Sequence, residues 1–364
     1  MEMVLPKENY VEQGYWKNEN IHTYLHRSAS QYPEKVAAVD PYFQLNYKEM
    51  HEQIRKLAGA LRSVGVRKGD VVSFQLPNWI EAVIIHQATA MIGAISNPIL
   101  PIYREKETAY ILDQSKTKVL FIPYTFRHFN YLEMVRLMRQ SIPSLKNIVV
   151  IDKYGDKPML ERLNKEESYT SFLQQGFVNE EIAVINESDP VLLLYTSGTT
   201  ANPKGVLHTH NTLLHEITSV INLYHLNQDD VIFMPSPVTH ITGVICGLEL
   251  PFVIQGKVVF QDIWEPTKAI QYLIREKCTW SLASTPFLRG IIQVLRPSDR
   301  KKLKLKAFPC GGADVPPELI KKAAATLGCS VARMYGSSEI PSISTCGYDD
   351  SLEKAAHTDG KILA

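Results

Sequence analysis

Short apolar runs alternate with longer amphipathic segments along most of this chain. Residues 71–75 read VVSFQ and residues 119–122 read VLFI, and each run predicts a buried strand. Between such runs lie segments with helical spacing, such as residues 46–64, whose apolar side chains recur on one face. Strands that alternate with helices of ten or more residues indicate mainly parallel sheets with helices on their faces. The chain is therefore predicted to adopt an α/β fold.

The alternation continues on both sides of a more polar stretch, residues 152–186. The further predicted strands are 35–39, 94–97, 147–151, 191–194, 231–234, 257–260, 280–283, 305–308 and 330–334. The further predicted helices are 21–33, 79–92, 105–114, 129–141, 211–226, 241–254, 266–277, 286–295 and 316–327. Because the polar stretch is irregular and contains a turn-like YGDKP, we expect a boundary there between two α/β units, residues 1–186 and 187–364.

Residues 191–205, VLLLYTSGTTANPKG, combine a buried strand with a cluster of small polar residues and a lysine. Glycine lets the backbone approach a bulky anion, hydroxyl and N–H groups donate hydrogen bonds to it, and Lys204 adds a positive charge. The order of residues differs from the Walker A loop, and the dinucleotide fingerprint G-x-G-x-x-G is absent. The local pattern predicts a phosphate-binding loop, with a polar surface turn as the alternative.

Three further loops with unusual composition follow predicted strands. They are residues 236–243 with His240, residues 310–314 with two adjacent glycines, and residues 335–339, which read YGSSE. Because ligands of parallel α/β sheets bind beyond the carboxyl ends of strands, these loops are expected to meet the phosphate loop. Together they offer a phosphate cradle, a histidine, a flat backbone surface and a carboxylate, which suits a nucleotide–Mg²⁺ site.

Each of these residues also has a purely structural interpretation. A lone histidine between apolar residues, such as His240, is more often a core residue than a functional one. Glu339 alone fits a solvated or capping group, Tyr335 fits ordinary core, and Gly311-Gly312 fits a plain turn. The functional interpretation depends on their coincidence with the loop at Thr196.

The motifs together resemble the adenylate-forming superfamily, which contains acyl-CoA synthetases, firefly luciferase and peptide-synthetase adenylation domains. YTSGTTANPKGV is similar to the family's [YF]TSGTTGxPKG loop, with Ala201 in place of a glycine. MYGSSE is similar to its YGxTE motif, with Ser338 in the threonine position, and PCGGA to the segment that packs against adenine. SPVTHITG resembles the loop that precedes the acyl pocket, as in stand-alone acyl-CoA synthetases. The likeness extends over nearly the whole chain.

The resemblance implies a role for each motif residue. It assigns the β- and γ-phosphates of ATP to Thr196, Ser197, Gly198, Thr199, Thr200 and Lys204. It places Tyr335 and Gly336 against adenine, opposite Gly311, Gly312 and Ala313, with Ser338 on the α-phosphate and Glu339 on Mg²⁺. It implies an acyl pocket formed by His240, Ile241, Gly243, Gly336 and Ile340. The residues closest to the chemistry would be Lys204, His240 and Glu339.

For the fold, the resemblance implies two stacked, mainly parallel sheets with interleaved helices, an αβαβα arrangement with the C-terminal barrel portion partial or missing. For activity, it implies an ATP-dependent carboxylic acid–CoA ligase, which forms acyl-AMP and then a thioester, with ATP, Mg²⁺ and coenzyme A as cofactors and co-substrates. An adenylation module that loads a carrier protein and a non-catalytic nucleotide- or acyl-binding fragment are the alternatives. Residues 235–243 contain no acidic residue to pair a substrate amine, which favours an acid with an uncharged tail.

The family continues beyond this point with a T-G-D segment that grips the ribose, a hinge and a small C-terminal domain carrying a catalytic lysine. This sequence stops at Ala364, and Thr358-Asp359-Gly360 has the wrong order for the ribose segment. We therefore expect a chain without the small domain to be impaired in adenylation and in thioester formation.

Bulk properties limit the other function classes. The net charge of +1 gives no electrostatic case for nucleic-acid binding, and the basic run at residues 300–306 fits a solvated loop leading into a strand. Five cysteines without a C-x-x-C pair favour a reduced, cytoplasmic protein. The N-terminus lacks a signal-peptide pattern, and the apolar window at 241–254 is too short for an integral membrane segment. The sequence does not determine the oligomeric state.

Overall fold

A computed structural model describes residues 7–153, 163–176, 184–196 and 202–363. Its largest sheet has seven strands in the order β11-β10-β4-β3-β5-β8-β9, and only the β10–β11 pair is antiparallel. The strands are β3 (Val71–Phe74), β4 (Ile95–Pro98), β5 (Val119–Pro123), β8 (Asn147–Ile151), β9 (Glu167–Ser168), β10 (Pro190–Thr196) and β11 (Lys204–Thr209). The mainly parallel sheet agrees with the alternation of strands and helices in the sequence.

The second sheet has five strands in the order β14-β12-β13-β1-β2 and is parallel except for the β1–β2 pair. Its strands are β1 (Val36–Val39), β2 (Gln44–Asn46), β12 (Val231–Met234), β13 (Lys257–Phe260) and β14 (Trp280–Ser281). A smaller sheet combines β15 (Cys310–Gly311), β16 (Arg333–Tyr335), β17 (Ser344–Thr345) and β18 (Lys361–Ile362), and it does not close into a barrel within the described residues. A hairpin joins β6 (Thr125–Phe126) to β7 (Phe129–Asn130).

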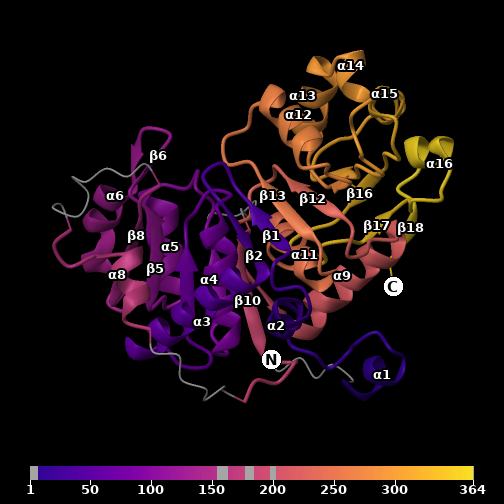
Figure 1. Cartoon of the computed structure of the whole chain (residues 1–364). Coiled ribbons are helices and arrows are strands. Elements are labelled where there is room, and N and C mark those ends of the chain that lie inside the picture. Colours follow the sequence, from indigo (N-terminus) through magenta and orange to yellow (C-terminus); the bar gives the residue numbers. More distant parts are fainter. Residues whose placement is uncertain (1–6, 154–162, 177–183, 197–201, 364) are drawn as a thin grey trace.

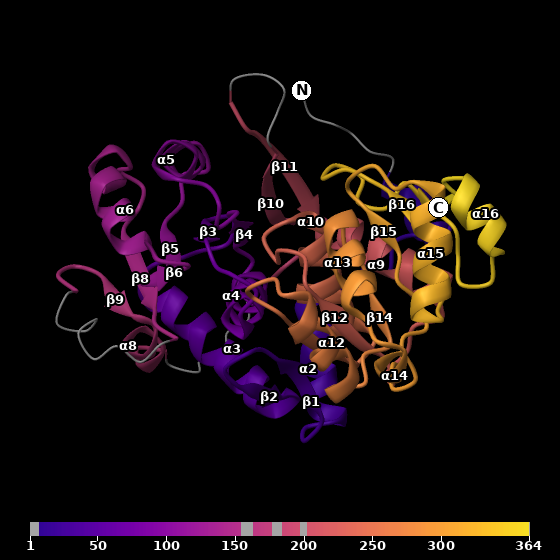
Figure 2. The same ribbon diagram turned by 90° about the horizontal axis from the view of Figure 1, so that it is seen from above.

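Helices cover both large sheets and fill the space between them (Figures 1 and 2). In the first half of the chain they are α1 (Lys7–Glu12), α2 (Ile21–Gln31), α3 (Tyr47–Ser63), α4 (Ile80–Met91), α5 (Glu105–Gln114), α6 (Tyr131–Met138), the 3₁₀ turn η1 (Arg139–Ser141) and α8 (Tyr169–Gln174). In the second half they are α9 (His210–Tyr224), α10 (Ile241–Gly243), the π-helix η2 (Val244–Glu249), α11 (Leu250–Val253), α12 (Pro266–Arg275), α13 (Thr285–Val294), α14 (Pro297–Arg300), α15 (Pro317–Leu327) and α16 (Leu352–His357).

Local sequence explains where several helices begin and what they bury. The Asn46 side chain caps α3 by accepting a hydrogen bond from the Glu49 N–H. The Glu49 carboxylate accepts a hydrogen bond from the Asn46 N–H, which completes a capping box. Helix α4 is buried from Ile80 to Ala90 because it packs against α2, α3, β3, β4 and η2. A helix whose apolar and polar side chains are all buried in this way belongs to the protein interior. One continuous core therefore contains residues of both large sheets.

Each large sheet takes strands from both sides of residue 187. Strands β1 and β2 join the sheet of β12 to β14, whereas β10 and β11 join the sheet of β3 to β9. The sheets do not follow the expected division into units 1–186 and 187–364, and a division into separate domains at that point stays a prediction.

Several predicted elements differ from the structure in their ends or their type. The helix predicted at 129–141 begins at Tyr131, because residues 129–130 pair in the β6–β7 hairpin. The strand predicted at 305–308 is reduced to isolated bridges at Ala307, and Pro309 next to it has no N–H to continue a ladder. Strand β11, and β9 with α8 inside the polar stretch, were not predicted. No helix in the described ranges is long and apolar enough to span a bilayer.

Candidate active site

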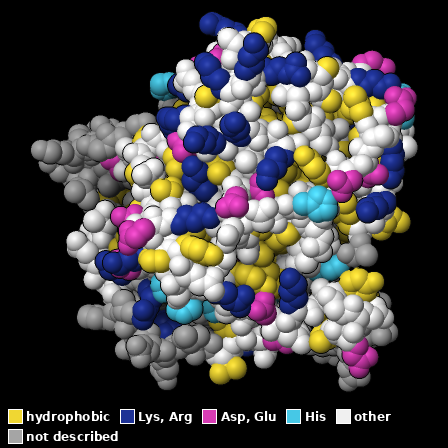
Figure 3. All heavy atoms as spheres, turned by 45° about the vertical axis from the view of Figure 1, so that its right-hand side comes forward, with side chains coloured by type: hydrophobic (Ala, Val, Ile, Leu, Met, Phe, Trp, Pro, Cys, Tyr) yellow, Lys and Arg dark blue, Asp and Glu magenta, His cyan; other side chains and the backbone are white. Residues whose placement is uncertain are grey.

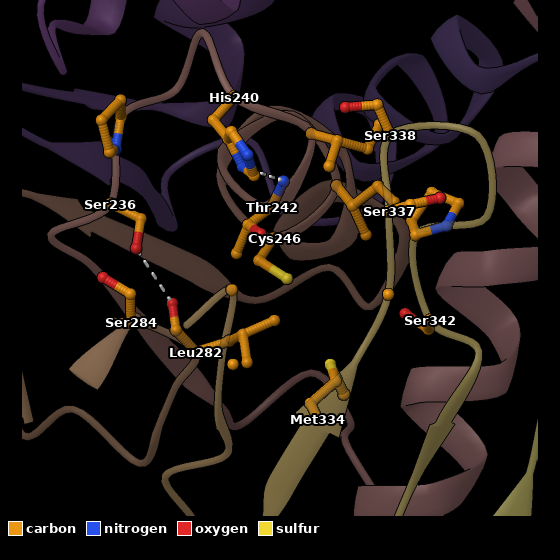
Figure 4. A pocket seen from close by; sticks show the side chains of 18 of the residues that line it. Ser236, His240, Thr242, Cys246, Leu282, Ser284, Met334, Ser337, Ser338 and Ser342 are labelled. Carbon is orange, nitrogen blue, oxygen red and sulfur yellow. Dashed lines mark hydrogen bonds between the residues drawn. The ribbon is translucent and has the colours of Figure 1, made fainter. Parts of the chain in front are cut away.

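A cavity of about 350 Å³ opens where strands of the second sheet and of the small sheet end (Figure 4). The lining residues are Leu100, Ser236, Pro237, His240, Ile241, Thr242, Ile245, Cys246, Leu282, Ala283, Ser284, Phe287, Gly311, Gly312, Met334, Gly336, Ser337, Ser338, Pro341 and Ser342. No Lys, Arg, Asp or Glu of the described ranges belongs to this lining. The cavity therefore suits a ligand whose buried part is uncharged.

The loop after β12 is fixed by Asn78, which lies at the start of α4 far away in the sequence. The Asn78 amide donates to the carbonyl oxygens of Met234 and Ser236 at 3.2 and 2.9 Å, and its oxygen accepts from the Val238 N–H at 2.9 Å. Gly243 lets the same loop fold back, because an added Cβ would lie 2.0 Å from the Pro237 carbonyl oxygen. The sequence motif identified the loop but not Asn78, which lies 158 residues from Ser236 in the sequence.

His240 stands at the N-terminus of α10 and lines the cavity. Its Nδ1 accepts a hydrogen bond from the Thr242 N–H at 3.3 Å, drawn as a dashed line in Figure 4. The side chain keeps an accessible surface, but the surrounding protein atoms desolvate it and lower its pKa. The ring is therefore neutral at pH 7, so it can offer hydrogen bonds at the cavity without adding a charge.

The loop 335–341 is a tight turn that depends on Gly336. A Cβ on Gly336 would lie 1.9 Å from the Pro341 carbonyl oxygen, so no other residue fits without rearranging the loop. Within the turn the Ser337 N–H donates to the Ile340 carbonyl oxygen at 2.9 Å. Gly336 and Ser338 line the cavity, whereas Tyr335, Glu339 and Ile340 are exposed and outside the lining.

The adjacent glycines after β15 bring a second stretch of bare backbone to the cavity. Gly311 pairs with Met334 of β16, and a Cβ on Gly311 would lie 2.2 Å from the Met334 carbonyl oxygen. Gly312 has a φ of 75°, a left-handed conformation that favours glycine. Both glycines line the cavity, whereas Ala313 is exposed and does not.

The predicted phosphate loop connects β10 to β11, and its middle, Ser197 to Ala201, lies outside the described residues. The two ends of the loop are described. Thr196 and Lys204 are partners in the antiparallel ladder, and the Lys204 side chain is exposed. The hairpin therefore brings a hydroxyl and a positive charge to the same end of the strand pair.

Comparison with known proteins assigns the chain to a family. The model of the family described as "AMP-binding enzyme" matches residues 25–364. The chain belongs to this family. Among the relatives of this AMP-binding chain, the "Medium-chain fatty-acid--CoA ligase" of Escherichia coli (strain K12) is 30% identical over 358 residues, covering 98% of this chain and 62% of the relative. The chain thus spans about three fifths of the length of that curated relative.

Solved structures show the same fold. The anthranilate CoA ligase AuaEII in complex with anthranoyl-AMP superimposes with a TM-score of 0.84 at 20% identity, covering 95% of this chain and 65% of that one. The N-terminal domain of FACL13 from Mycobacterium tuberculosis gives a TM-score of 0.81 at 23% identity, covering 94% of this chain and 82% of that one. The predicted α/β fold of the adenylate-forming enzymes is confirmed.

The residues of this AMP-binding chain fit the nucleotide and the metal ion that the family implies. The backbone at Gly312 has open space where a Cβ would lie, and Tyr335 is 61% exposed and free to stack on a flat ring. Glu339 presents an exposed carboxylate that makes no ion pair within the described part of the chain. Magnesium is typically bound by one or two carboxylates together with phosphate oxygens, so a single free carboxylate at this place suits it.

Proposed function

We propose that this chain is the nucleotide- and acid-binding part of an ATP-dependent carboxylic acid–CoA ligase. The observation that carries the proposal is the single cavity shared by His240, the Gly311-Gly312 backbone and the Gly336–Ser338 turn. The motifs implied for adenine, the α-phosphate and the acid thus border one space, although they lie about a hundred residues apart in the sequence. The reaction would join the acid to AMP with release of pyrophosphate, and coenzyme A would then displace AMP.

The chain's own residues would bind and orient the reactants. Lys204 and the hydroxyls from Thr196 to Thr200 would hold the β- and γ-phosphates, and Ser338 would contact the α-phosphate. Glu339 would hold Mg²⁺, which, when bound, offsets the negative charge that develops as the carboxylate attacks phosphorus. His240 would border the carboxylate of the substrate acid. Because its ring is neutral, it would neither repel nor neutralise that charge. These assignments, including Tyr335 and Ala313 at the adenine and Gly243 and Ile340 at the acyl pocket, are proposals.

The acid is expected to have an uncharged tail. The lining includes the apolar residues Ile245, Leu282, Phe287 and Met334, and apart from the neutral His240 its polar side chains are hydroxyls and a thiol. Burial of a charged tail against such a wall would cost several kcal/mol, about the penalty of an unpaired buried ion. The relative from Escherichia coli is named for medium-chain fatty acids, which agrees with this expectation.

Pyrophosphate exchange tests the proposal with a panel of uncharged carboxylic acids. The assay is run on this chain and on this chain joined to the C-terminal domain of an acyl-CoA ligase. We expect exchange by the extended protein and little by the chain alone, because the mobile domain completes the site. A thioester formed on coenzyme A, and none on a phosphopantetheinyl carrier protein, separates the ligase from a carrier-loading module.

Binding measurements test the site itself. Lys204→Ala and Glu339→Gln should each weaken MgATP binding about tenfold or more, the size expected for loss of one charge-assisted contact. Lys301→Ala, an exposed lysine in the basic loop, is the matched control and should leave affinity unchanged. Unchanged affinity in both site variants would overturn the assignment, and no exchange by the extended protein with any acid would contradict the ligase function.

A further inference from the structure

His208 lies on β11, four residues beyond Lys204, and its side chain is buried although its neighbour Leu207 is 59% exposed. Its Nε2 lies 2.7 Å from the carbonyl oxygen of Ser338, 130 residues away in the sequence. This hydrogen bond connects the β10–β11 hairpin, called the phosphate hairpin below, to the turn that carries Ser338 and Glu339. The resemblance to known motifs assigned His208 no role.

The chemistry of the pair fixes the direction of the bond. A carbonyl oxygen can only accept, so Nε2 carries the hydrogen and donates. Desolvation lowers the pKa of His208, while the bond to Ser338 and the negative charge of Glu339 act in the opposite direction. Nδ1 then stays an acceptor, with the Thr212 hydroxyl 3.5 Å away. The ring is held in one tautomer with its N–H directed at the turn.

The carbonyl that accepts this bond belongs to the peptide unit between Ser338 and Glu339. Because a peptide unit is planar, fixing its oxygen also fixes its N–H and limits the directions of both flanking side chains. Two further bonds lie within the turn, from the Ser337 N–H to the Ile340 carbonyl and from the Ile340 N–H to the Ser337 hydroxyl at 3.2 Å. His208 supplies an anchor from outside the turn.

We propose that His208 is a positioning residue that holds the Ser338–Glu339 peptide in a fixed position relative to the phosphate hairpin. This inference rests on the proposed function, in which Glu339 binds the metal ion and Lys204 the phosphates. Lys204 and His208 stand on one strand, so the phosphate contact and the metal carboxylate are set relative to each other by a single rigid element. Loss of this hydrogen bond should weaken the binding of the metal–nucleotide complex more than the binding of metal-free nucleotide.

The test compares three variants of the full chain. His208→Leu removes the N–H with little change in size, His208→Gln keeps a side-chain N–H donor, and Leu207→Ala changes the exposed side of the same strand. Mn²⁺ binding in the presence of ATP is measured by electron paramagnetic resonance, and metal-free ATP binding by equilibrium dialysis. Thermal unfolding of each variant reports whether the fold is retained.

In the complex with ATP, we expect His208→Leu to weaken Mn²⁺ binding about tenfold, roughly the effect of losing one hydrogen bond at a buried carbonyl. Metal-free ATP affinity should change less than about twofold, His208→Gln should restore most of the Mn²⁺ affinity, and Leu207→Ala should match the unmodified chain.

Unchanged Mn²⁺ affinity in His208→Leu would overturn the inference while leaving the proposed function intact. An equal loss of Mn²⁺ and metal-free ATP affinity, or a loss that His208→Gln does not rescue, would also overturn it, since both indicate a general structural defect. If the unmodified chain binds neither ATP nor Mn²⁺–ATP, the proposed function fails, and the role of His208 fails with it.

Discussion

Glu216 is a partly buried carboxyl on α9 that faces Ser342, one of the residues lining the cavity. Desolvation raises its pKa to about 7 from an ordinary value of 4.5, and hydrogen bonds from the Ser342 hydroxyl and N–H offset part of the shift. The folded chain therefore binds this proton more tightly than the unfolded chain does. It follows that the folded state loses stability as pH rises from 4.5 towards 7, and that the loss is complete above that range.

Replacing Glu216 by glutamine should remove this pH-dependent loss. We expect Glu216→Gln to be more stable than the unmodified chain near pH 8 by on the order of 1 to 2 kcal/mol, because each pKa unit corresponds to about 1.4 kcal/mol and water reaches part of the group. Near pH 4.5 the difference should largely vanish. Urea unfolding at the two pH values measures the effect, and Glu52→Gln, at an exposed position on α3, is the control. An advantage that is the same at both pH values would contradict the assignment.

At the scale of single residues, the sequence predicted those site residues that belong to short motifs. His240, Gly311, Gly312, Gly336 and Ser338 lie around one cavity because each follows a strand end, and strand ends of parallel sheets gather on one side. Asn78 was not identified, because its partners lie 156 to 183 residues away in the sequence. Contacts of this kind depend on how the elements pack, which a local motif does not record.

At the scale of elements, apolar periodicity was most informative where an element has a buried apolar face or run. The predicted bounds of α5 and β8 are the observed ones, whereas β11 was missed because KGVLHT is polar and half exposed. The predicted helix at 241–254 contains the π-helix η2, whose wider turn no apolar pattern distinguishes from an α-helix. Two-residue strands such as β15 and β17 form only because neighbouring strands pair with them.

A buried polar network holds η2 against α4. Glu249, the last residue of η2, is hydrogen-bonded to His86 Nε2, and His86 Nδ1 lies 2.8 Å from the Ser96 hydroxyl. The Gln87 amide donates to the other Glu249 oxygen at 3.2 Å and to the Leu248 carbonyl at 3.0 Å. Because Ile245 and Cys246 of η2 line the cavity, this network supports one of its walls.

Breaking this network should destabilise the fold strongly. Glu249→Ala leaves the buried His86 without its partner and is expected to lower the free energy of unfolding by about 3 to 5 kcal/mol. Glu249→Gln keeps the shape and one hydrogen-bonding oxygen, so its loss should be clearly smaller. Glu353→Ala, which breaks an exposed pair with Lys321, should cost at most about 1 kcal/mol. Urea unfolding gives all three values, and equal small losses would show that the network contributes little.

At the scale of the whole molecule, the two large sheets are joined by exchange of strands and by packing around α4 (Figure 2). The order of elements in the sequence predicted mainly parallel sheets, and the family resemblance implied two of them. Neither predicted that β1 and β2 leave their neighbours in the chain for the sheet of β12. That choice depends on long-range pairing, such as Ala38 with Val258. Lys and Arg side chains gather over the region of α12 to α15 (Figure 3), where residues 301–304 form the predicted solvated loop.

Lys153 is a further link between the sheets, because it follows β8 and reaches a residue that follows β1. Its Nζ lies 3.3 Å from Asp40 and 2.7 Å from Glu81 of α4, and all three side chains are less than a tenth exposed. The ammonium also lies 3.7 Å from the centre of the Phe43 ring. Desolvation raises the pKa of Glu81, and the charge of Lys153 acts against that shift. The positive charge of Lys153 therefore lies beside two buried carboxyl groups at the junction of the two sheets.

Replacing Lys153 by methionine would leave two buried carboxylates without a cation. We expect Lys153→Met to lower the free energy of unfolding near pH 8 by about 3 to 5 kcal/mol, the usual cost of removing one member of a buried ion pair. The loss should be smaller near pH 5, because Glu81, whose pKa burial raises, can then take up a proton in the folded state. Urea unfolding at both pH values measures it, and Lys116→Met, which removes an exposed pair with Asp113, should change stability by less than about 0.5 kcal/mol. If the two variants lose equally little at both pH values, Lys153 does not hold the sheets together, and the junction depends on apolar packing around α4 alone.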